Sequence, residues 1–288
     1  MLILTENRDR SGAFDGPVPR SMSFYFRGIL LLALLAGPAW ADQLADIKAR
    51  GRLVVGISDV TPPFSFRRPG EGDPVGYDLD LVRRVAQKMG VALEMVSIPD
   101  TQRIPILQQG KVDLVASTFT RTPERLREVD FSVTIFYSPH VIIVDKASGL
   151  TSVRQLAGRK IGVLKGRTSD KSLLEAIPTA ELVYVDNYAI AFSGIKDGNL
   201  AAFATDNLVL RTYLKKESDA DRYFFLPDYK NGRNAGYGMK KGERNLKDAV
   251  DRALLELEAS GVAAQIFDAW FGPRSEVPLV RSFQIKPD

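Results

Sequence analysis

The sequence contains no cysteine and only one histidine, His140, among its 288 residues. Without cysteine the chain can form no disulfide, no thiolate nucleophile and no cysteine-ligated metal site. A single histidine cannot supply the pair that commonly holds zinc, and a serine–histidine–aspartate triad would have to be built around His140. These absences exclude most hydrolase and metalloenzyme classes, and we expect neither a metal nor another cofactor.

Long hydrophobic runs are also scarce. One apolar run, Gly28–Gly37, follows Arg27 and precedes Ala39-Trp40-Ala41, and it is too short to span a bilayer comfortably. A basic residue, an apolar run and small residues in this order are typical of a secretory signal peptide. We therefore expect cleavage before Asp42, with residues 1–21 as an upstream extension. A membrane anchor is the alternative.

Basic residues are not concentrated in any segment. The chain has 39 Lys and Arg against 35 Asp and Glu, and charges of both signs alternate without a Lys/Arg-rich run. This pattern is typical of a solvated surface rather than of a nucleic-acid-binding face. We expect no nucleic-acid partner.

Strand-like and helix-like segments alternate over residues 53–116 and again over residues 160–204. β-branched runs end at turn residues, and the segments between them carry apolar residues at helical spacing. This alternation favours an α/β fold with parallel sheets. The predicted strands are Leu53–Ile57, Ala92–Ile98, Val112–Ala116, Lys160–Leu164, Leu182–Val185 and Ala201–Ala204; the predicted helices are Tyr77–Met89, Ile104–Gln109, Ser169–Ala176, Tyr188–Lys196, Asn245–Glu258 and Val262–Trp270.

An extended stretch, Phe131–Val144, separates the two alternating sets, and a second one, Asn234–Met239, follows the second set. We interpret the sets as two lobes, with the chain crossing between them twice and the C-terminal helices returning to the first lobe. One continuous doubly wound sheet is the alternative. The predicted divisions are residues 1–41 (extension and signal peptide), 42–137 plus 238–288 (first lobe) and 138–237 (second lobe).

The stretch Ser117-Thr118-Phe119-Thr120 follows a predicted strand, at the end where open α/β sheets bind ligands. Thr122 is the expected N-cap of the next helix and Pro123 its first residue, which places Arg125 in the first turn. A cation there opposes the helix dipole, at a cost of about 0.3–1 kcal/mol.

A planar anion bound by Arg125 would outweigh that cost, since each charge-assisted hydrogen bond contributes about 1.5–3 kcal/mol. A surface ion pair with Glu124 or Glu128 explains Arg125 equally well. The residues alone leave both interpretations open.

Two segments of the second lobe offer matching chemistry. Lys165-Gly166-Arg167-Thr168-Ser169 begins a helix, where a glycine followed by hydroxyls suits either an anion site or a cap. Asp206 follows the strand Ala201–Ala204 and either binds an ammonium group or caps the next helix. An anion clamp, hydroxyls and a carboxylate for an amine together describe a receptor for a zwitterion.

These residues lie in motifs that resemble the periplasmic amino-acid-binding proteins of ABC importers, and the resemblance runs from about Gly51 to Gly272. It implies an α/β, two-lobed periplasmic binding protein fold of type II that closes on its ligand like a flytrap, with two hinge crossings. The segments "RIPILQ" and "TIF" are most similar to the glutamate/aspartate-binding branch. The matching motifs are "GYDLDL" (76–81), "RIPILQQGKVDLVASTFTRTPER" (103–125), "DFS" (130–132), "KIGVLKGRTS" (160–169), "AAFATDN" (201–207) and "WFG" (270–272).

The resemblance implies roles for individual residues. Arg125 matches the arginine that grips the ligand α-carboxylate, and Asp206 matches the carboxylate that binds the α-ammonium group. Four further residues match contacts to the α-carboxylate: Ser117 through its backbone, Thr118, Thr120 and Thr168.

The residues expected around the ligand side chain depart from the family pattern. Relatives with acidic ligands carry an arginine at the position of Ser58 and a histidine at that of Tyr188, whereas Arg103 does match a second arginine of that branch. An aromatic pair of other branches would fall at Thr61 and Asp100 and is absent. Asp100 either neutralises Arg103 or faces a cationic ligand, so the ligand side chain stays open.

We therefore expect a monomeric, non-catalytic protein of the periplasm that binds a free polar or acidic L-amino acid and delivers it to an inner-membrane ABC permease. A cyclohexadienyl dehydratase-like enzyme on the same fold is one alternative. It needs a general acid, and an aspartate paired with an ammonium group is a poor proton donor because its partner lowers its pKa. A sensory binding protein that docks on a membrane receptor is the other alternative.

Overall fold

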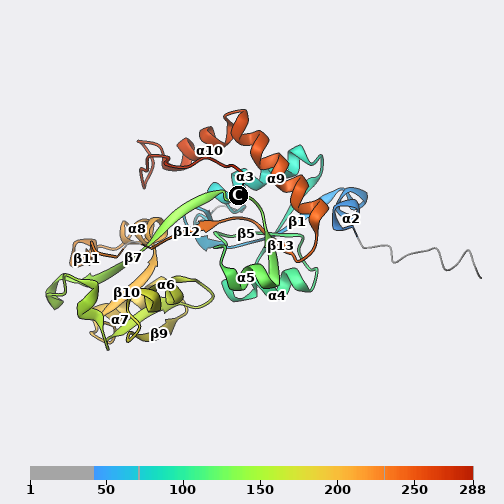
Figure 1. The fold of residues 1–288 in the computed structure, drawn as a ribbon. Coiled ribbons are helices and arrows are strands. Elements are labelled where there is room, and N and C mark those ends of the chain that lie inside the picture. Colours follow the sequence, from blue (N-terminus) through green and yellow to red (C-terminus); the bar gives the residue numbers. More distant parts are fainter. Residues whose placement is uncertain (1–41, 71, 230, 288) are drawn as a thin grey trace, which may run out of the picture. The chain divides into compact units, whose positions relative to one another are not determined.

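The computed structural model describes residues 42–70, 72–229 and 231–287, which form two sheets flanked by helices (Figure 1). The predicted extension and signal peptide, residues 1–41, lie outside the described residues, so the cleavage prediction is not tested. Within those ranges no helix combines the length and the apolar character needed to cross a membrane.

The first sheet, with strand order β4-β1-β5-β13-β6, forms the first lobe. β1 is parallel to β4 and β5, whereas β13 returns from distant sequence and pairs antiparallel with β5 and β6. Figure 1 shows α3, α9 and α10 on one face of this sheet and α4 and α5 on the other. The bounds are α2 (Gln43–Arg50), β1 (Arg52–Ile57), α3 (Tyr77–Lys88), β4 (Ala92–Ser97), α4 (Arg103–Gln108), β5 (Leu114–Ala116), α5 (Pro123–Glu128), β6 (Val129–Phe131), β13 (Gly238–Lys240), α9 (Arg244–Ala259) and α10 (Val262–Phe271).

The second sheet, with strand order β11-β7-β10-β8-β9, forms the second lobe, and β12 adds to it by pairing with β7. β8 is parallel to β9 and β10, while β7 is antiparallel to its neighbours. The bounds are β7 (Phe136–Asp145), β8 (Lys160–Leu164), α6 (Ser169–Ala176), β9 (Glu181–Val185), α7 (Tyr188–Lys196), β10 (Ala202–Asp206), α8 (Asn207–Leu214), β11 (Tyr223–Phe225) and β12 (Asn231–Ala235).

Short elements complete the described chain. A two-stranded sheet of β2 (Val60–Thr61) and β3 (Ser65–Phe66) extends the loop after β1. Four 3-10 helices lie in connecting segments: η2 (Asp100–Gln102), η3 (Lys146–Ser148), η4 (Val153–Leu156) and η5 (Ala220–Arg222).

The chain crosses between the lobes at residues 132–135 and 236–237, and the two crossings lie side by side. The backbone N–H of Ser132 donates to the carbonyl of Tyr237 at 2.9 Å, and that of Ile135 donates to the carbonyl of Ala235 at 2.9 Å. The Tyr77 hydroxyl, on α3, donates to the carbonyl of Ile135 at 3.0 Å. Two paired crossings anchored to a helix of the first lobe make a hinge.

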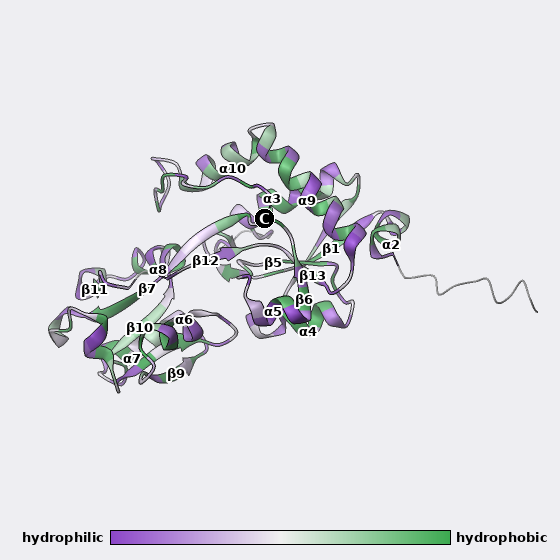
Figure 2. Cartoon of the chain, in the orientation of Figure 1, coloured by the Kyte–Doolittle hydropathy of each residue, from purple (hydrophilic) through white to green (hydrophobic). Residues whose placement is uncertain are grey.

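In Figure 2 hydrophobic and hydrophilic residues alternate along the helices. The buried hydrophobic side chains include those of Leu53, Val55 and Ile57 in β1 and of Ala202, Phe203 and Ala204 in β10. Where the first crossing enters β7, the ring of Phe136 lies 4.8 Å from that of Phe64 and 5.2 Å from that of Phe271. All three side chains are at most 1% exposed. This cluster joins the start of the second lobe to the core of the first.

The predicted elements are confirmed to within a few residues at their ends, because their apolar spacing and turn residues are local signals. The predicted two crossings are also confirmed, and the alternative of one continuous sheet is wrong, since two separate sheets form. The lobe limits after residues 137 and 237 stay a prediction.

Candidate functional site

The two lobes contact each other where the segment after β5 faces the loop after β8. Nη2 of Arg125, in the first lobe, donates to the carbonyl of Gly166, in the second, at 2.9 Å. The side chain of Arg167 extends in the opposite sense, from the second lobe to Thr118 and Asp100 of the first. We call this region the lobe junction. It brings the predicted site segments of both lobes together.

Arg125 is held by its own loop. The N-cap Thr122 accepts from the Arg125 backbone N–H at 3.3 Å, as predicted from the Thr122-Pro123 pair. Nη1 of Arg125 donates to the carbonyl of Thr120 at 2.9 Å, and the guanidinium lies 4.7 Å from the ring centre of Phe119. Burial lowers the pKa of Arg125 to about 10, which leaves the group charged at neutral pH.

Neither surface ion pair proposed for Arg125 forms in the described part of the chain. Glu124 pairs instead with Lys171 of the second lobe at 3.1 Å, and Glu128 accepts from Gln108 at 3.5 Å. The unfavourable interaction of Arg125 with the helix dipole is also smaller than expected, because α5 has only six residues and Arg125 belongs to its last turn as much as to its first. A partly buried guanidinium with no carboxylate partner is suited to an anion site.

Thr118 has an unusual backbone conformation, with φ +44°, in the left-handed region that β-branched residues avoid. Its N–H donates to Oδ2 of Asp78 at 2.6 Å. Strain of this kind is kept where the surrounding structure imposes it, and such positions cluster at ligand sites. The Thr118 hydroxyl accepts from Nη1 of Arg167 at 3.3 Å.

Asp78 was missed as a site residue. It lies in the first turn of α3, is 1% exposed, and occupies the helix face that otherwise carries buried apolar residues. Burial raises its pKa to about 7, against the lowering effect of the Thr118 N–H and of the Arg103 and Arg167 guanidiniums. The signal that could have identified Asp78 is a carboxylate on an otherwise apolar helix face, within "GYDLDL".

Asp100, in η2, binds two arginines at once. Its Oδ1 accepts from Arg103 and its Oδ2 from Arg167. Burial opposes ionisation, but these two guanidiniums lower the pKa of Asp100. Asp100 therefore does neutralise Arg103, one of the two alternatives left open by the sequence, and it does so while shared with a second cation.

Arg103 is 2% exposed and also donates from Nη2 to the Ser117 hydroxyl at 3.1 Å. Burial lowers its pKa to about 9 despite the favourable charge of Asp100. Its Nε–H is buried and has no hydrogen-bond partner in the described chain. Arg103 is thus positioned beside the start of the Ser117–Thr120 stretch with donor capacity left.

Arg167 is the second residue that sequence reasoning missed. Its side chain is 12% exposed, and in addition to Asp100 and Thr118 it reaches the Thr61 hydroxyl, which accepts from Nη2 at 2.8 Å. Burial opposes its charge, but Asp100 raises the pKa of Arg167. In the sequence, the glycine and hydroxyls of the segment Lys165–Ser169 indicate an anion site or a helix cap, but no local pattern assigns a role to Arg167.

Ser58 and Tyr188, the two departures from the acidic-ligand pattern, are both buried and hydrogen-bonded. The Ser58 and Thr61 hydroxyls lie 2.7 Å apart, and the Thr61 hydroxyl accepts from Arg167. Ser58 is therefore linked to the Arg167 guanidinium through Thr61. The Tyr188 hydroxyl lies 3.2 Å from Oγ1 of Thr205, and its ring stacks on that of Tyr213 at 4.0 Å.

Thr168 occupies the N-cap position of α6 and is 5% exposed. Its hydroxyl has no partner in the described chain, and the same holds for the hydroxyl of Ser169. A buried polar group without a partner costs about 1–3 kcal/mol, so native structures rarely keep one without a purpose. The Thr168 hydroxyl is available to a ligand, as its predicted role requires.

Asp206 caps α8. Its Oδ1 accepts from the backbone N–H groups of Leu208 at 2.9 Å and Val209 at 3.1 Å. The capping interpretation is therefore confirmed, but both bonds use one oxygen, and the other can still accept from an ammonium group. Burial raises the pKa of Asp206 despite the lowering effects of the Ser138 hydroxyl, the capped N–H groups and the Arg167 guanidinium.

His140 does not build a catalytic triad. Its Nδ1 lies 3.1 Å from the Ser172 hydroxyl, but Ser172 is fully buried within α6 and also donates to the carbonyl of Thr168 at 3.3 Å. A nucleophile must reach its substrate, and this one has no exposed surface. In the described residues no group of three His, Asp or Glu side chains is arranged to hold a metal ion.

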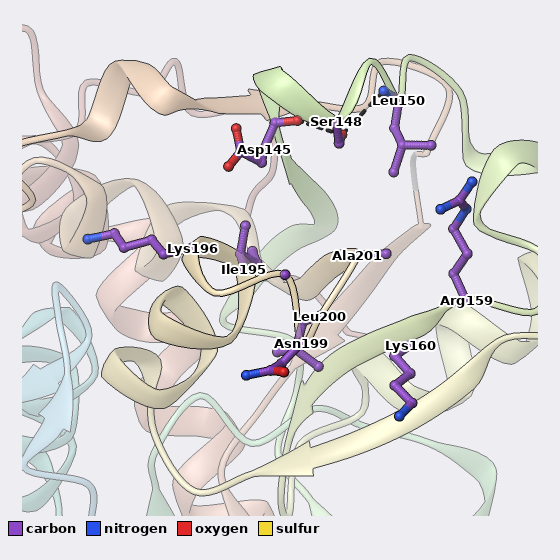
Figure 3. A pocket seen from close by; sticks show the side chains of 11 residues that line it. Asp145, Ser148, Leu150, Arg159, Lys160, Ile195, Lys196, Asn199, Leu200 and Ala201 are labelled. Carbon is purple, nitrogen blue, oxygen red and sulfur yellow. Dashed lines mark hydrogen bonds between the residues drawn. The ribbon is translucent and has the colours of Figure 1, made fainter.

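A separate pocket of about 440 Å³ lies in the second lobe (Figure 3) and includes none of the predicted site residues. Its cationic residue Lys196 already pairs with Glu217 at 3.2 Å and Asp219 at 3.1 Å. Figure 3 shows Arg159 and Lys160 on the side away from Lys196. Its charges do not converge, so the lobe junction is the stronger candidate.

The chain is similar to known solute-binding proteins. The profile of the bacterial extracellular solute-binding proteins, family 3, matches residues 53–273. The chain is 30% identical over 233 residues to the glutamine-binding protein of an ABC transporter from Bacillus subtilis, covering 80% of this chain and 84% of that protein. It is 28% identical over 258 residues to an L-glutamate/L-aspartate-binding protein from Pseudomonas aeruginosa, covering 84% and 85%.

Among solved structures, an ancestral arginine-binding protein bound to arginine is 34% identical, with a TM-score of 0.71, covering 77% of this chain and 99% of that chain. These three proteins are binders rather than enzymes, which agrees with the non-catalytic prediction. They differ in the amino acid named, so the glutamate/aspartate branch stays a prediction.

Proposed function

The chain belongs to the bacterial extracellular solute-binding proteins, family 3, and we propose that it captures a polar or acidic L-amino acid between its lobes for an ABC permease. The observation that carries this proposal is the placement of Arg125. Its guanidinium has no carboxylate partner among the described residues and lies at the lobe junction, within hydrogen-bond distance of Gly166 in the other lobe. An anion bound there touches both lobes and favours their closure.

Arg125 grips the ligand α-carboxylate in this proposal. Two of its five N–H groups are used by the carbonyls of Thr120 and Gly166, so three remain for the ligand. The hydroxyls of Thr118, Thr120 and Thr168 and the backbone of Ser117 add donors around the same carboxylate.

Asp206 binds the ligand α-ammonium group through the oxygen that does not cap α8. Burial has raised its pKa, and an ammonium group at hydrogen-bond distance lowers it again. The ligand thereby stabilises the ionised form of Asp206. Arg103, Ser58, Asp100 and Tyr188 surround the ligand side chain.

Export and assembly are part of the same proposal. We infer a periplasmic protein that functions as a monomer after a signal peptide is removed before Asp42. Asp42 is the N-cap of α2, accepting from the Leu44 N–H at 3.1 Å, so cleavage there leaves the first helix complete. Mass spectrometry of exported protein checks the new N-terminus.

A thermal-shift screen of the twenty amino acids tests the binding function. A ligand present at 100 times its dissociation constant and absent from the unfolded chain adds about 2.7 kcal/mol to the free energy of unfolding. We expect a clear rise in Tm for at least one polar or acidic L-amino acid and none for its D-enantiomer. A screen without any shift, repeated by calorimetry, contradicts the proposal.

A further inference from the structure

Three guanidinium groups converge at the lobe junction, and Arg167 brings the third from the second lobe. Arg103 and Arg167 both bind Asp100, while Arg125 has no carboxylate partner in the described chain. Arg167 also contacts Thr61 at 2.8 Å and Thr118 at 3.3 Å. Because its backbone lies in the other lobe, these contacts of Arg167 link the two lobes.

The charges at the junction do not cancel. Asp100 has two oxygens, and each already accepts from a different arginine, so two cations share one carboxylate. Asp78 contributes only part of a charge near neutral pH, since burial raises its pKa to about 7. A zwitterion adds none, because its α-carboxylate meets Arg125 and its α-ammonium meets Asp206. A net positive charge of less than one unit is left beside Asp100.

The unused donors lie on the same two arginines. Three of the five N–H groups of Arg167 donate to Asp100, Thr118 and Thr61, which leaves two. The Nε–H of Arg103 is buried without a partner in the part of the chain that the structure describes. A buried cation with free donors is unfavourable unless an anion meets it.

We propose that Arg167 is the residue that selects the ligand side chain, and that this side chain is a carboxylate, as in glutamate or aspartate. The inference rests on the proposed function and specifies its ligand class. A neutral amide would leave the excess charge in place, and an arginine ligand would add a further guanidinium to it. Acidic amino acids bind better than both, because a carboxylate forms charge-assisted hydrogen bonds with Arg167 and Arg103.

The first test uses the unmodified protein, so it does not depend on the folding of a variant. Calorimetry with glutamate, aspartate, glutamine and arginine at one ionic strength gives the preference directly. We expect glutamate or aspartate to bind about tenfold or more tightly than glutamine, and arginine to bind most weakly. Equal or tighter binding of glutamine or arginine overturns the inference.

The second test replaces Arg167. We expect Arg167→Gln to weaken binding of the acidic ligand about tenfold or more and binding of glutamine by a clearly smaller factor, since only a charged side chain needs the cation. Lys165→Gln is the matched control: it removes a charge from the same loop, but its side chain is 51% exposed and pairs with Asp186. Lys165→Gln should leave both affinities unchanged.

The outcomes separate the inference from the function on which it rests. An unchanged preference for acidic ligands in Arg167→Gln assigns the selection to other residues and overturns the inference. Improved binding of glutamine or arginine by Arg167→Gln, with glutamate unaffected, makes Arg167 an obstacle in the site and also overturns it. Binding of a polar, uncharged amino acid alone leaves the proposed function intact and overturns only this inference. Binding of a basic amino acid alone also contradicts the proposed ligand class, and binding of no amino acid removes both.

Discussion

The backbone of Gly166, in the second lobe, lies directly against that of Thr101, in the first. A Cβ added to Gly166 would lie 2.9 Å from the backbone nitrogen of Thr101 and 2.9 Å from the carbonyl carbon of Asp100. Contacts below 3.0 Å with backbone atoms cannot be relieved by a side-chain rotation. Glycine at this position therefore lets the lobes approach closely enough for the Gly166 carbonyl to accept from Arg125.

We expect Gly166→Ala to hinder closure and to weaken amino-acid binding about tenfold or more, because the added methyl group keeps the lobes apart. Gly158→Ala is the matched control. Gly158 has a similar φ, +67° against +74° for Gly166, but an added Cβ there meets nothing within 4 Å. Both variants carry the backbone cost of a left-handed alanine, about 1–2 kcal/mol. Calorimetry should find the binding defect in Gly166→Ala alone, and equal defects would exclude a clash between the lobes.

Removing the guanidinium of Arg125 should weaken ligand binding by about 2–4 kcal/mol, since a charge-assisted bidentate pair is lost. Arg125→Ala should also lower the free energy of unfolding by about 1 kcal/mol, because the side chain packs over Phe119. Arg125→Lys should recover only part of the affinity, as a point charge lacks the fork geometry.

Arg127→Ala serves as the control, since Arg127 is exposed on the same helix α5. Titration calorimetry gives the affinities and urea unfolding gives the stabilities. If Arg125→Ala binds the amino acid as tightly as the unmodified protein does, Arg125 is not part of the binding site.

Two variants of Asp206 should separate its capping role from its role in ligand binding. Asp206→Asn keeps a side-chain oxygen for the N–H groups of Leu208 and Val209, so the stability should change by less than about 0.5 kcal/mol. The same variant loses the charge that pairs with the ligand ammonium group, and its free energy of binding should become less favourable by about 2–5 kcal/mol. Asp206→Ala should lose the affinity and about 1 kcal/mol of stability as well. If Asp206→Asn binds normally, the carboxylate is only a helix cap.

Asp78 should make stability depend on pH. Burial raises its pKa to about 7 in the folded chain, above the ~3.9 of an unfolded chain. Between these values the folded chain holds the extra proton, so the free energy of unfolding falls as the pH rises from about 4 to about 7.

Asp78→Asn keeps an acceptor for the Thr118 N–H and removes this titration. We expect the variant to be more stable than the parent at pH 8, by up to about 1.4 kcal/mol for each unit of pKa shift, and to lose that advantage near pH 4. Urea unfolding at both pH values measures the difference, with the exposed Asp73→Asn as control. A gain that does not change with pH would assign the effect to packing.

The sequence alone determined which segments become strands and helices, because the signals for them are local. Thr122 and Pro123 begin α5 where predicted, and α6, β8 and the first residue of α7 fall on predicted bounds. The position of Arg125 after β5 could also be predicted from the sequence, and it indicates a candidate site because ligands bind at the carboxyl ends of parallel strands.

The tertiary structure decided how the charges are shared. Arg167 lies 67 residues from Asp100 in sequence and 106 from Thr61, yet it contacts both. No periodicity or cap relates residues that far apart, and their contact depends on how the lobes pack across the hinge. Asp78 is similar: its neighbour Thr118 lies 40 residues away. Electrostatic interaction depends on distance and burial in space, which a linear order of residues does not contain.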